Sequence, residues 1–159
     1  MSKKNNIFLI LILLVISLSL LGAFFIEYVL NHNPCKLCIY ERIPYILSIL
    51  LIIEFLFFKK NGKITLLILA ITFSISTVLA FYHFGIEQEF FSELSMCNIK
   101  NTSEALSKEE LLNQLKQNNV SCRDVTFKLF GLSLASINTI FSFILSVIFL
   151  KLFLNYEKN

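Results

Sequence analysis

Three long apolar runs without a charged side chain dominate the pattern of hydrophobic and polar positions along the chain. They cover residues 7–26, 64–86 and 129–150 and are 20, 23 and 22 residues long. A helix needs about 20 apolar residues to cross the hydrocarbon core of a bilayer. A fourth run at 43–58 has 16 residues and includes Pro44, which is tolerated in a first helical turn. The pattern predicts an all-α, single-domain integral membrane protein over residues 1–159, a bundle of four transmembrane helices at about 7–29, 43–58, 64–86 and 130–154.

Composition supports a membrane protein and excludes other classes. Hydrophobic residues make up 56% of the chain and charged residues 16%, whereas ordinary soluble domains have about 45–50% and about 25%. This hydrophobicity excludes disorder and leaves too little polar surface for a water-soluble globule. The net charge of +3 is spread along the chain and forms no basic stripe, so we expect contact with membrane lipid and not with nucleic acid.

Basic residues near the ends of the predicted helices indicate which way each connection faces. The connection at about 87–129 carries five basic and seven acidic residues. The opposite side carries seven lysines and, outside the apolar runs, a single acid: Lys3, Lys4, Lys59, Lys60, Lys63, Lys151, Lys158 and Glu157. By the positive-inside rule, both termini and the 59–63 loop face the cytoplasm, and the connections at about 30–42 and 87–129 face outward. In a bacterial inner membrane, the outward side is the periplasm. A signal peptide is the alternative for the first run, but its length and the lack of an A-x-A site favour a retained helix.

The longer periplasmic connection contains one pattern typical of a helix start. Ser107 and Glu110 fit the S-x-x-E capping box, which predicts a short helix as far as about Gln117. We expect its leucines to pack on the protein or in the membrane interface, and a solvated helix is the alternative.

All four cysteines lie in the connections predicted to face the periplasm, where disulfides persist. Cys35 and Cys38 form a C-x-x-C, an arrangement that commonly lowers the pKa of one thiol, and Arg42 follows Cys38 by one helical turn. This favours a redox-active pair over a structural disulfide. We expect no metal, because zinc normally takes four ligands and the chain has no second close pair of cysteines.

Cys97 and Cys122 are 25 positions apart. Alone, they would be interpreted as a disulfide that stabilises the loop by about 3 kcal/mol. Beside a C-x-x-C on the same side of the membrane, they can instead exchange disulfides with that pair. The chain has no haem, flavin or iron–sulfur signature to accept the electrons, which leaves a lipid-soluble quinone.

Residues 34–42, Pro-Cys-Lys-Leu-Cys-Ile-Tyr-Glu-Arg, resemble the C-x-x-C-I-Y-E-R signature of the DsbB family, the membrane quinone reductases that reoxidise the periplasmic thiol oxidase DsbA. The resemblance covers nearly the whole chain and includes Phe-Gly-Leu-Ser at 130–133, expected to open the last helix. The chain departs from better-known relatives in having no Trp. The resemblance implies a thiol:quinone oxidoreductase with a thioredoxin-fold DsbA-like partner and ubiquinone or menaquinone as acceptor.

The resemblance also implies a role for each site residue. Cys97 would be attacked by the thiolate of the reduced partner, and Cys122 would then exchange with Cys35. Cys38 would be the thiolate that faces the quinone and can form a charge-transfer or covalent adduct with its ring. Arg42 would stabilise that thiolate and the charge on the reduced quinone, as its position after Cys38 independently suggests.

Two further residues have alternative interpretations. His83, near the outer end of the third predicted helix, is either a quinone-binding proton donor or an interfacial histidine. For Glu41 we favour a structural role, because neighbouring residues point in different directions on a helix.

Two other functions remain open. A membrane oxidoreductase similar to the vitamin K epoxide reductase family also pairs a C-x-x-C with loop cysteines, but it places the C-x-x-C after the loop pair. The other alternative is a non-enzymatic membrane protein with two structural disulfides.

Overall fold

The computed structural model describes residues 3–58, 62–92, 121–123, 127–129 and 131–156. The helix predicted at 107–117 lies outside this part of the chain. The described residues form four long helices, one short helix and one small hairpin: α1 (Lys3–Tyr28), α2 (Lys36–Tyr40), α3 (Arg42–Phe58), α4 (Gly62–Glu87), β1 (Lys128–Leu129), β2 (Leu132–Ser133) and α6 (Leu134–Tyr156).

Three of these helices are long and apolar enough to cross a membrane, namely Asn6–Tyr28, Gly62–Glu87 and Leu134–Tyr156. This confirms the predicted helical membrane protein and three of its spans by length and composition. The 17 residues of α3 extend for about 25 Å, at about 1.5 Å per residue. That length is less than the hydrocarbon thickness of about 30 Å. A fourth crossing by α3 therefore stays a prediction.

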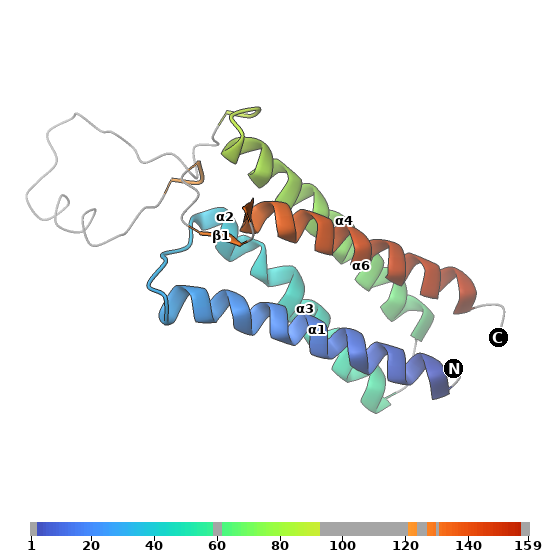
Figure 1. Cartoon of the computed structure of the whole chain (residues 1–159). Coiled ribbons are helices and arrows are strands. Elements are labelled where there is room, and N and C mark those ends of the chain that lie inside the picture. Colours follow the sequence, from blue (N-terminus) through green and yellow to red (C-terminus); the bar gives the residue numbers. More distant parts are fainter. Residues whose placement is uncertain (1–2, 59–61, 93–120, 124–126, 130, 157–159) are drawn as a thin grey trace, which may run out of the picture.

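The four long helices pack around a shared apolar core (Figure 1). Ile16, Ile52, Phe73 and Phe149 come from α1, α3, α4 and α6 respectively, and all four are fully buried. The rings of Phe73 and Phe149 stack with centroids 5.6 Å apart. Small polar residues also join α4 to α6: Ser76 Oγ lies 3.1 Å from Ser142 Oγ, and Ser74 Oγ lies 2.7 Å from Ser146 Oγ. Small residues let helix backbones approach closely, as is common between membrane helices.

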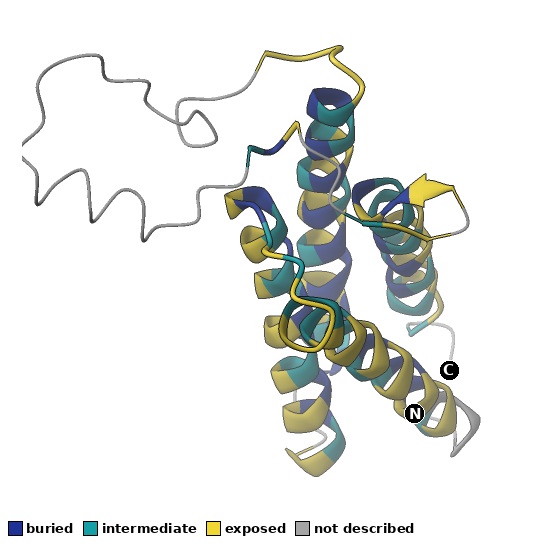
Figure 2. Ribbon diagram, turned by 60° about the vertical axis from the view of Figure 1, so that its left-hand side comes forward, coloured by how far each residue is buried: buried dark blue, intermediate teal, exposed yellow. Residues whose placement is uncertain are grey.

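The outer faces of the long helices are apolar. Figure 2 shows exposed residues along the outside of the helices and buried ones facing inward. Leu18, Phe57 and Val78 are 66%, 81% and 69% exposed, and other large apolar side chains are exposed along each long helix. Such extensive apolar surface is not found on soluble monomers. It fits helices whose outer faces contact lipid.

The short elements gather at one end of the helices. The first turn of α1 and the last turn of α6 lie at the opposite end (Figure 1). The strands pair antiparallel, with Lys128 opposite Ser133 and Leu129 opposite Leu132. Gly131 has a φ of +84°, which a right-handed helix does not allow. The last helix therefore begins at Leu134, after the hairpin, and not at about 130 as predicted.

Candidate active site

The C-x-x-C begins the short helix α2. Cys35 is the N-cap of this helix, with extended backbone, and its sulfur accepts the backbone N–H of Cys38 at 3.3 Å. The two sulfur atoms lie 2.9 Å apart, and both cysteines are free thiols. Cys35 is buried and Cys38 is partly buried. A short helix thus begins at the motif itself, before the helix predicted at 43–58, and it directs backbone N–H groups at Cys35.

The surroundings of the two thiols separate their pKa values. The hydrogen bond from Cys38, together with the hydrogen bond and positive charge of His83, lowers the pKa of Cys35 from its ordinary 9.0 to about 4, despite the opposing effect of burial. The hydrogen bond to Cys35, burial and the nearby negative charges of Cys35 and Glu41 raise the pKa of Cys38. In the reduced pair, Cys35 therefore carries the thiolate charge. The role predicted for Cys38, as the thiolate that faces a quinone, does not concern this reduced pair but a different stage of the reaction. It stays a prediction.

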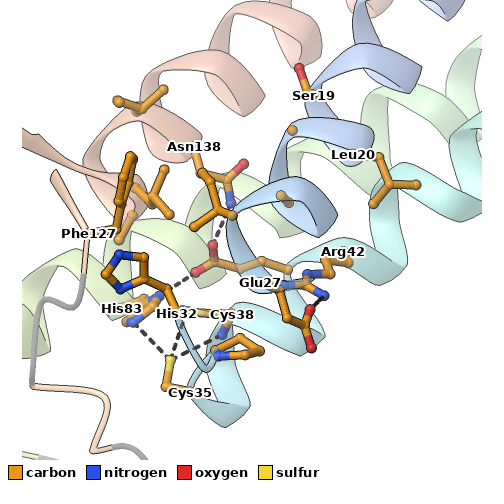
Figure 3. A pocket seen from close by; sticks show the side chains of 18 of the residues that line it. Ser19, Leu20, Glu27, His32, Cys35, Cys38, Arg42, His83, Phe127 and Asn138 are labelled. Carbon is orange, nitrogen blue, oxygen red and sulfur yellow. Dashed lines mark hydrogen bonds and ion pairs between the residues drawn. The ribbon is translucent and has the colours of Figure 1, made fainter. Parts of the chain in front are cut away.

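His83 connects the dithiol to a buried carboxylate. Its Nε2 lies 3.4 Å from the sulfur of Cys35, and its Nδ1 donates to Glu41 Oε1 at 2.7 Å. His83 and Glu41 are only 2% and 7% exposed. Both ring nitrogens thus face acceptors, and a doubly protonated imidazolium satisfies both. In Figure 3, dashed lines join the Cys35 sulfur to His83, and His83 to an unlabelled carboxylate that belongs to Glu41.

Glu41 is held from the other side by a polar network inside the helices. Asn138 Nδ2 donates to Glu41 Oε2 at 2.6 Å, and the Tyr45 hydroxyl donates to Asn138 Oδ1. Ser142 Oγ lies 3.2 Å from the Tyr45 hydroxyl and 3.3 Å from Asn138 Oδ1. This network fixes the Glu41 carboxylate between α6 and His83. Glu41 therefore belongs to the site through direct contact with His83, which sequence reasoning missed.

Arg42 is paired with a carboxylate on α1. Its guanidinium donates to Glu27 Oε2, and it lies 4.9 Å from the ring centroid of Phe24. The side chains of Arg42 and Glu27 are 14% and 20% exposed. Arg42 and Cys38 line the same cavity. The negative charges that act on Cys38 in the reduced pair are those of Cys35 and Glu41. Stabilisation of the Cys38 thiolate by Arg42 stays a prediction.

These groups line a cavity of about 370 Å³, which falls within the usual range for small-molecule sites, about 300–1,000 Å³. The dithiol and the charged side chains form one side of it, whereas α1 and α6 supply apolar walls. Figure 3 shows Cys35, Cys38, His83, Glu27 and Arg42 close together, with Leu20 farther along α1. The apolar lining residues include Leu20, Ala23, Ile26, Leu134, Ile137 and Phe141. The cavity can hold a molecule with an apolar body and a polar, redox-active head.

The structure brings three possible metal ligands together. Ligand atoms of Cys35, Cys38 and His83 all lie within 4.8 Å of one another. Sequence spacing did not reveal this, because His83 is far from the cysteines along the chain. Structural zinc sites take four ligands, and His83 Nε2 is already directed at the Cys35 sulfur. The absence of a metal stays a prediction.

Cys122 lies close to the dithiol. It is 1% exposed and packs in a small buried cluster with Cys35, Leu37 and Ile86. Cys122 is disulfide-bonded, whereas Cys35 and Cys38 are free. Cys97 lies outside the described residues. The structure thus places one loop cysteine in the same cluster as the first cysteine of the C-x-x-C.

Comparison with known proteins points to one family. The family model described as disulfide bond formation protein DsbB matches residues 5–152. An uncharacterised protein of Rickettsia prowazekii (strain Madrid E) is 29% identical over 161 residues, and the alignment covers 98% of this chain and 93% of that protein. No solved structure shows a significant match.

Proposed function

Because this chain belongs to the DsbB family, it is a bacterial inner-membrane oxidoreductase of disulfide bond formation, and we propose that it passes electrons from a periplasmic DsbA-like dithiol oxidase to membrane quinone. The observation that carries this proposal is the free dithiol of Cys35 and Cys38 on the wall of a largely apolar cavity between helices. A lipid-soluble acceptor can reach such a site from the membrane. Ubiquinone and menaquinone both have the required apolar body and paired carbonyl oxygens.

The residues of the cavity fit a quinone. Arg42 supplies a positive charge, which favours negative charge developing on a quinone oxygen during reduction. Glu27 holds the guanidinium in place from α1. Leu20, Ile26 and Phe141 offer apolar contact to a ring or its tail. The quinone would supply the two-electron oxidation, and the protein's own residues bind it, orient it and manage the protons.

The proposed reaction begins at the loop pair. A thiolate of the reduced partner attacks Cys97 in a disulfide with Cys122, which releases Cys122 as a thiolate. Cys122 then attacks Cys35 in an oxidised Cys35–Cys38 disulfide, which releases Cys38. The partner's second thiol resolves the mixed disulfide at Cys97, and Cys97 in turn displaces Cys35 from Cys122. The partner ends oxidised, the loop disulfide is restored, and Cys35 and Cys38 remain as a dithiol.

His83 and Glu41 serve the second half of the reaction. His83 Nε2 is placed to accept the proton of Cys35, and Glu41 holds the ring in position and favours its protonated form. We propose that this pair keeps Cys35 ionised until the dithiol gives its two electrons to the quinone. The location of Cys122 in the same buried cluster supports exchange between the two cysteine pairs.

The proposed topology has four crossings, with α3 as the second. Both termini and the 59–63 loop lie in the cytoplasm, and the cysteines lie in the periplasm. The excess of lysine on one side supports this orientation. It places the dithiol on the side of the membrane where a periplasmic partner can reach it.

The test is steady-state quinone reduction by the purified protein in lipid nanodiscs, with a reduced DsbA-like oxidase as electron donor. We expect quinone absorbance to fall in step with oxidation of the partner. Cys38→Ser should abolish this reaction, and Tyr28→Phe, an exposed substitution on α1, should leave it unchanged. Loop and C-x-x-C cysteines that stay oxidised in the presence of the reduced partner would instead favour a protein with two structural disulfides.

A further inference from the structure

A third carboxyl group lies on the cavity wall beside His83, in addition to those of Glu27 and Glu41. Glu87 is the last residue of α4, one helical turn after His83, and its side chain is 7% exposed. Its Oε1 lies 3.9 Å from His83 Nε2. Its Oε2 is buried and has no hydrogen-bond partner among the described residues, although Glu87 lines the cavity. A buried polar oxygen without a partner is costly, so a ligand in the cavity is a natural partner for it.

Glu87 has charged neighbours of both signs. Ser133 on β2, the imidazole of His83, and the negative groups Glu41 and Cys35 all lie around its carboxyl group. Glu87 also lies at the C-terminal end of α4, where the helix dipole disfavours a negative charge. A protonated carboxyl group has one O–H donor, and a quinone carbonyl oxygen is an acceptor without a proton of its own.

We propose that Glu87 is a catalytic residue that hydrogen-bonds to one carbonyl oxygen of the bound quinone and donates the proton this oxygen takes up on reduction. This inference rests on the proposed thiol:quinone activity. His83 lies between Cys35 and Glu87, at 3.4 Å from the Cys35 sulfur and 3.9 Å from Glu87 Oε1. It can therefore pass the proton of Cys35 to Glu87.

The proposed step balances in atoms and electrons. Oxidation of the reduced pair forms the Cys35–Cys38 bond and releases two electrons and two protons, which are the S–H proton of Cys38 and the proton that His83 has taken from Cys35. The quinone takes both electrons and becomes a hydroquinone with two new O–H bonds. Glu87 supplies one of these protons and regains it from Cys35 through His83. The proton of Cys38 leaves to water at the membrane surface. The other quinone oxygen takes its proton from the same water.

The test compares Glu87→Gln with Glu89→Gln. Both substitutions replace a carboxyl by an amide of the same size, but the Glu89 side chain is 69% exposed and has an ion pair with Arg123 outside the cavity. For Glu87→Gln we expect the kcat of quinone reduction to fall by about a hundredfold, the lower end of the range for removal of a positioned acid. Oxidation of the reduced partner in a single turnover without added quinone should be unchanged. Glu89→Gln should behave as wild type.

An infrared difference spectrum between the oxidised and reduced protein with ubiquinone gives a readout independent of turnover. The wild type and Glu89→Gln should show a protonated-carboxyl band that changes on quinone reduction, and Glu87→Gln should lack it. Normal kcat in Glu87→Gln, or a carboxyl band that persists in it, would overturn the role of Glu87. Failure of the wild-type protein to reduce quinone would instead overturn the proposed function itself.

Discussion

Replacement of His83 by alanine should raise the pKa of Cys35 substantially. The ring supplies both a hydrogen bond and a positive charge to the Cys35 sulfur, 3.4 Å away. Two unit charges at this separation interact by roughly 5 kcal/mol at an effective dielectric constant of about 20. One pKa unit corresponds to about 1.36 kcal/mol, so complete loss of the charge sets an upper limit of about 3–4 units.

The hydrogen bond and backbone N–H of Cys38 remain in the variant, and water partly replaces the imidazole. We therefore expect a rise of about 2–3 units, as a fraction of that upper limit. Since the pKa of Cys35 is about 4 in the intact site, the thiolate fraction of the variant should grow between about pH 5 and pH 8, whereas that of the wild type should be nearly complete over this range.

The assay is pulsed alkylation of the reduced protein with iodoacetamide at a series of pH values. Fragment-ion mass spectrometry separates modification of Cys35 from that of Cys38 on the same peptide. His32→Ala is the matched control, because His32 lines the same cavity but packs against the ring of Phe127. Equal midpoints for Cys35 in the wild type and in His83→Ala would refute the role assigned to His83.

Three other predictions test the remaining parts of the proposal. Arg42→Met should lower the turnover and the apparent affinity for quinone by about tenfold, or about 1.4 kcal/mol, and Arg42→Lys should lose less, with partner capture unchanged in both. Steady-state rates measured against quinone concentration test this, and normal rates at low quinone would contradict it. Cys97→Ser should abolish partner capture, whereas Cys122→Ser should trap the partner as a mixed disulfide, visible on non-reducing gels, because the resolving thiol is lost. Undiminished turnover in both variants would show that the pair is a structural disulfide. Reporter tags at the C-terminus and at 59–63 should lie in the cytoplasm and a tag at Asn101 in the periplasm, and the reverse would overturn the topology.

The main helices could be predicted from the sequence because lipid requires long, uninterrupted apolar segments. The start of the last helix could not, because the hydrophobic run continues through the hairpin at 128–133. Gly131, with its positive φ, lies between the two strands, but a glycine is also tolerated inside membrane helices, so it gave no sign of the hairpin. The dithiol was predictable because its two cysteines are close in sequence.

The partners of Glu41 could not be predicted in this way. His83 and Asn138 are 42 and 97 positions away from it, and no local pattern connects residues so far apart. Glu41 also lies at the junction of α2 and α3, where it caps the short helix. This break directs its side chain toward His83 on α4, whereas Arg42 reaches Glu27 on α1, so that adjacent residues contact different helices around one cavity.

The two cysteines of the C-x-x-C differ in their surroundings, and this difference supports the order of action proposed for them. The pKa of Cys38 is raised chiefly by its hydrogen bond to Cys35, and the negative charge of Cys35 adds to this effect. Both contributions disappear when Cys35 is joined to Cys122, since a disulfide sulfur carries no charge. In the proposed exchange, we therefore expect the pKa of Cys38 to fall once Cys122 has attacked Cys35. Cys38 would leave this exchange as a thiolate on the wall of a cavity that Arg42 also lines. Disulfide exchange at Cys35 would in this way prepare Cys38 to react with the quinone. The low pKa of Cys35 in the reduced pair is then compatible with the role that the family resemblance implies for Cys38.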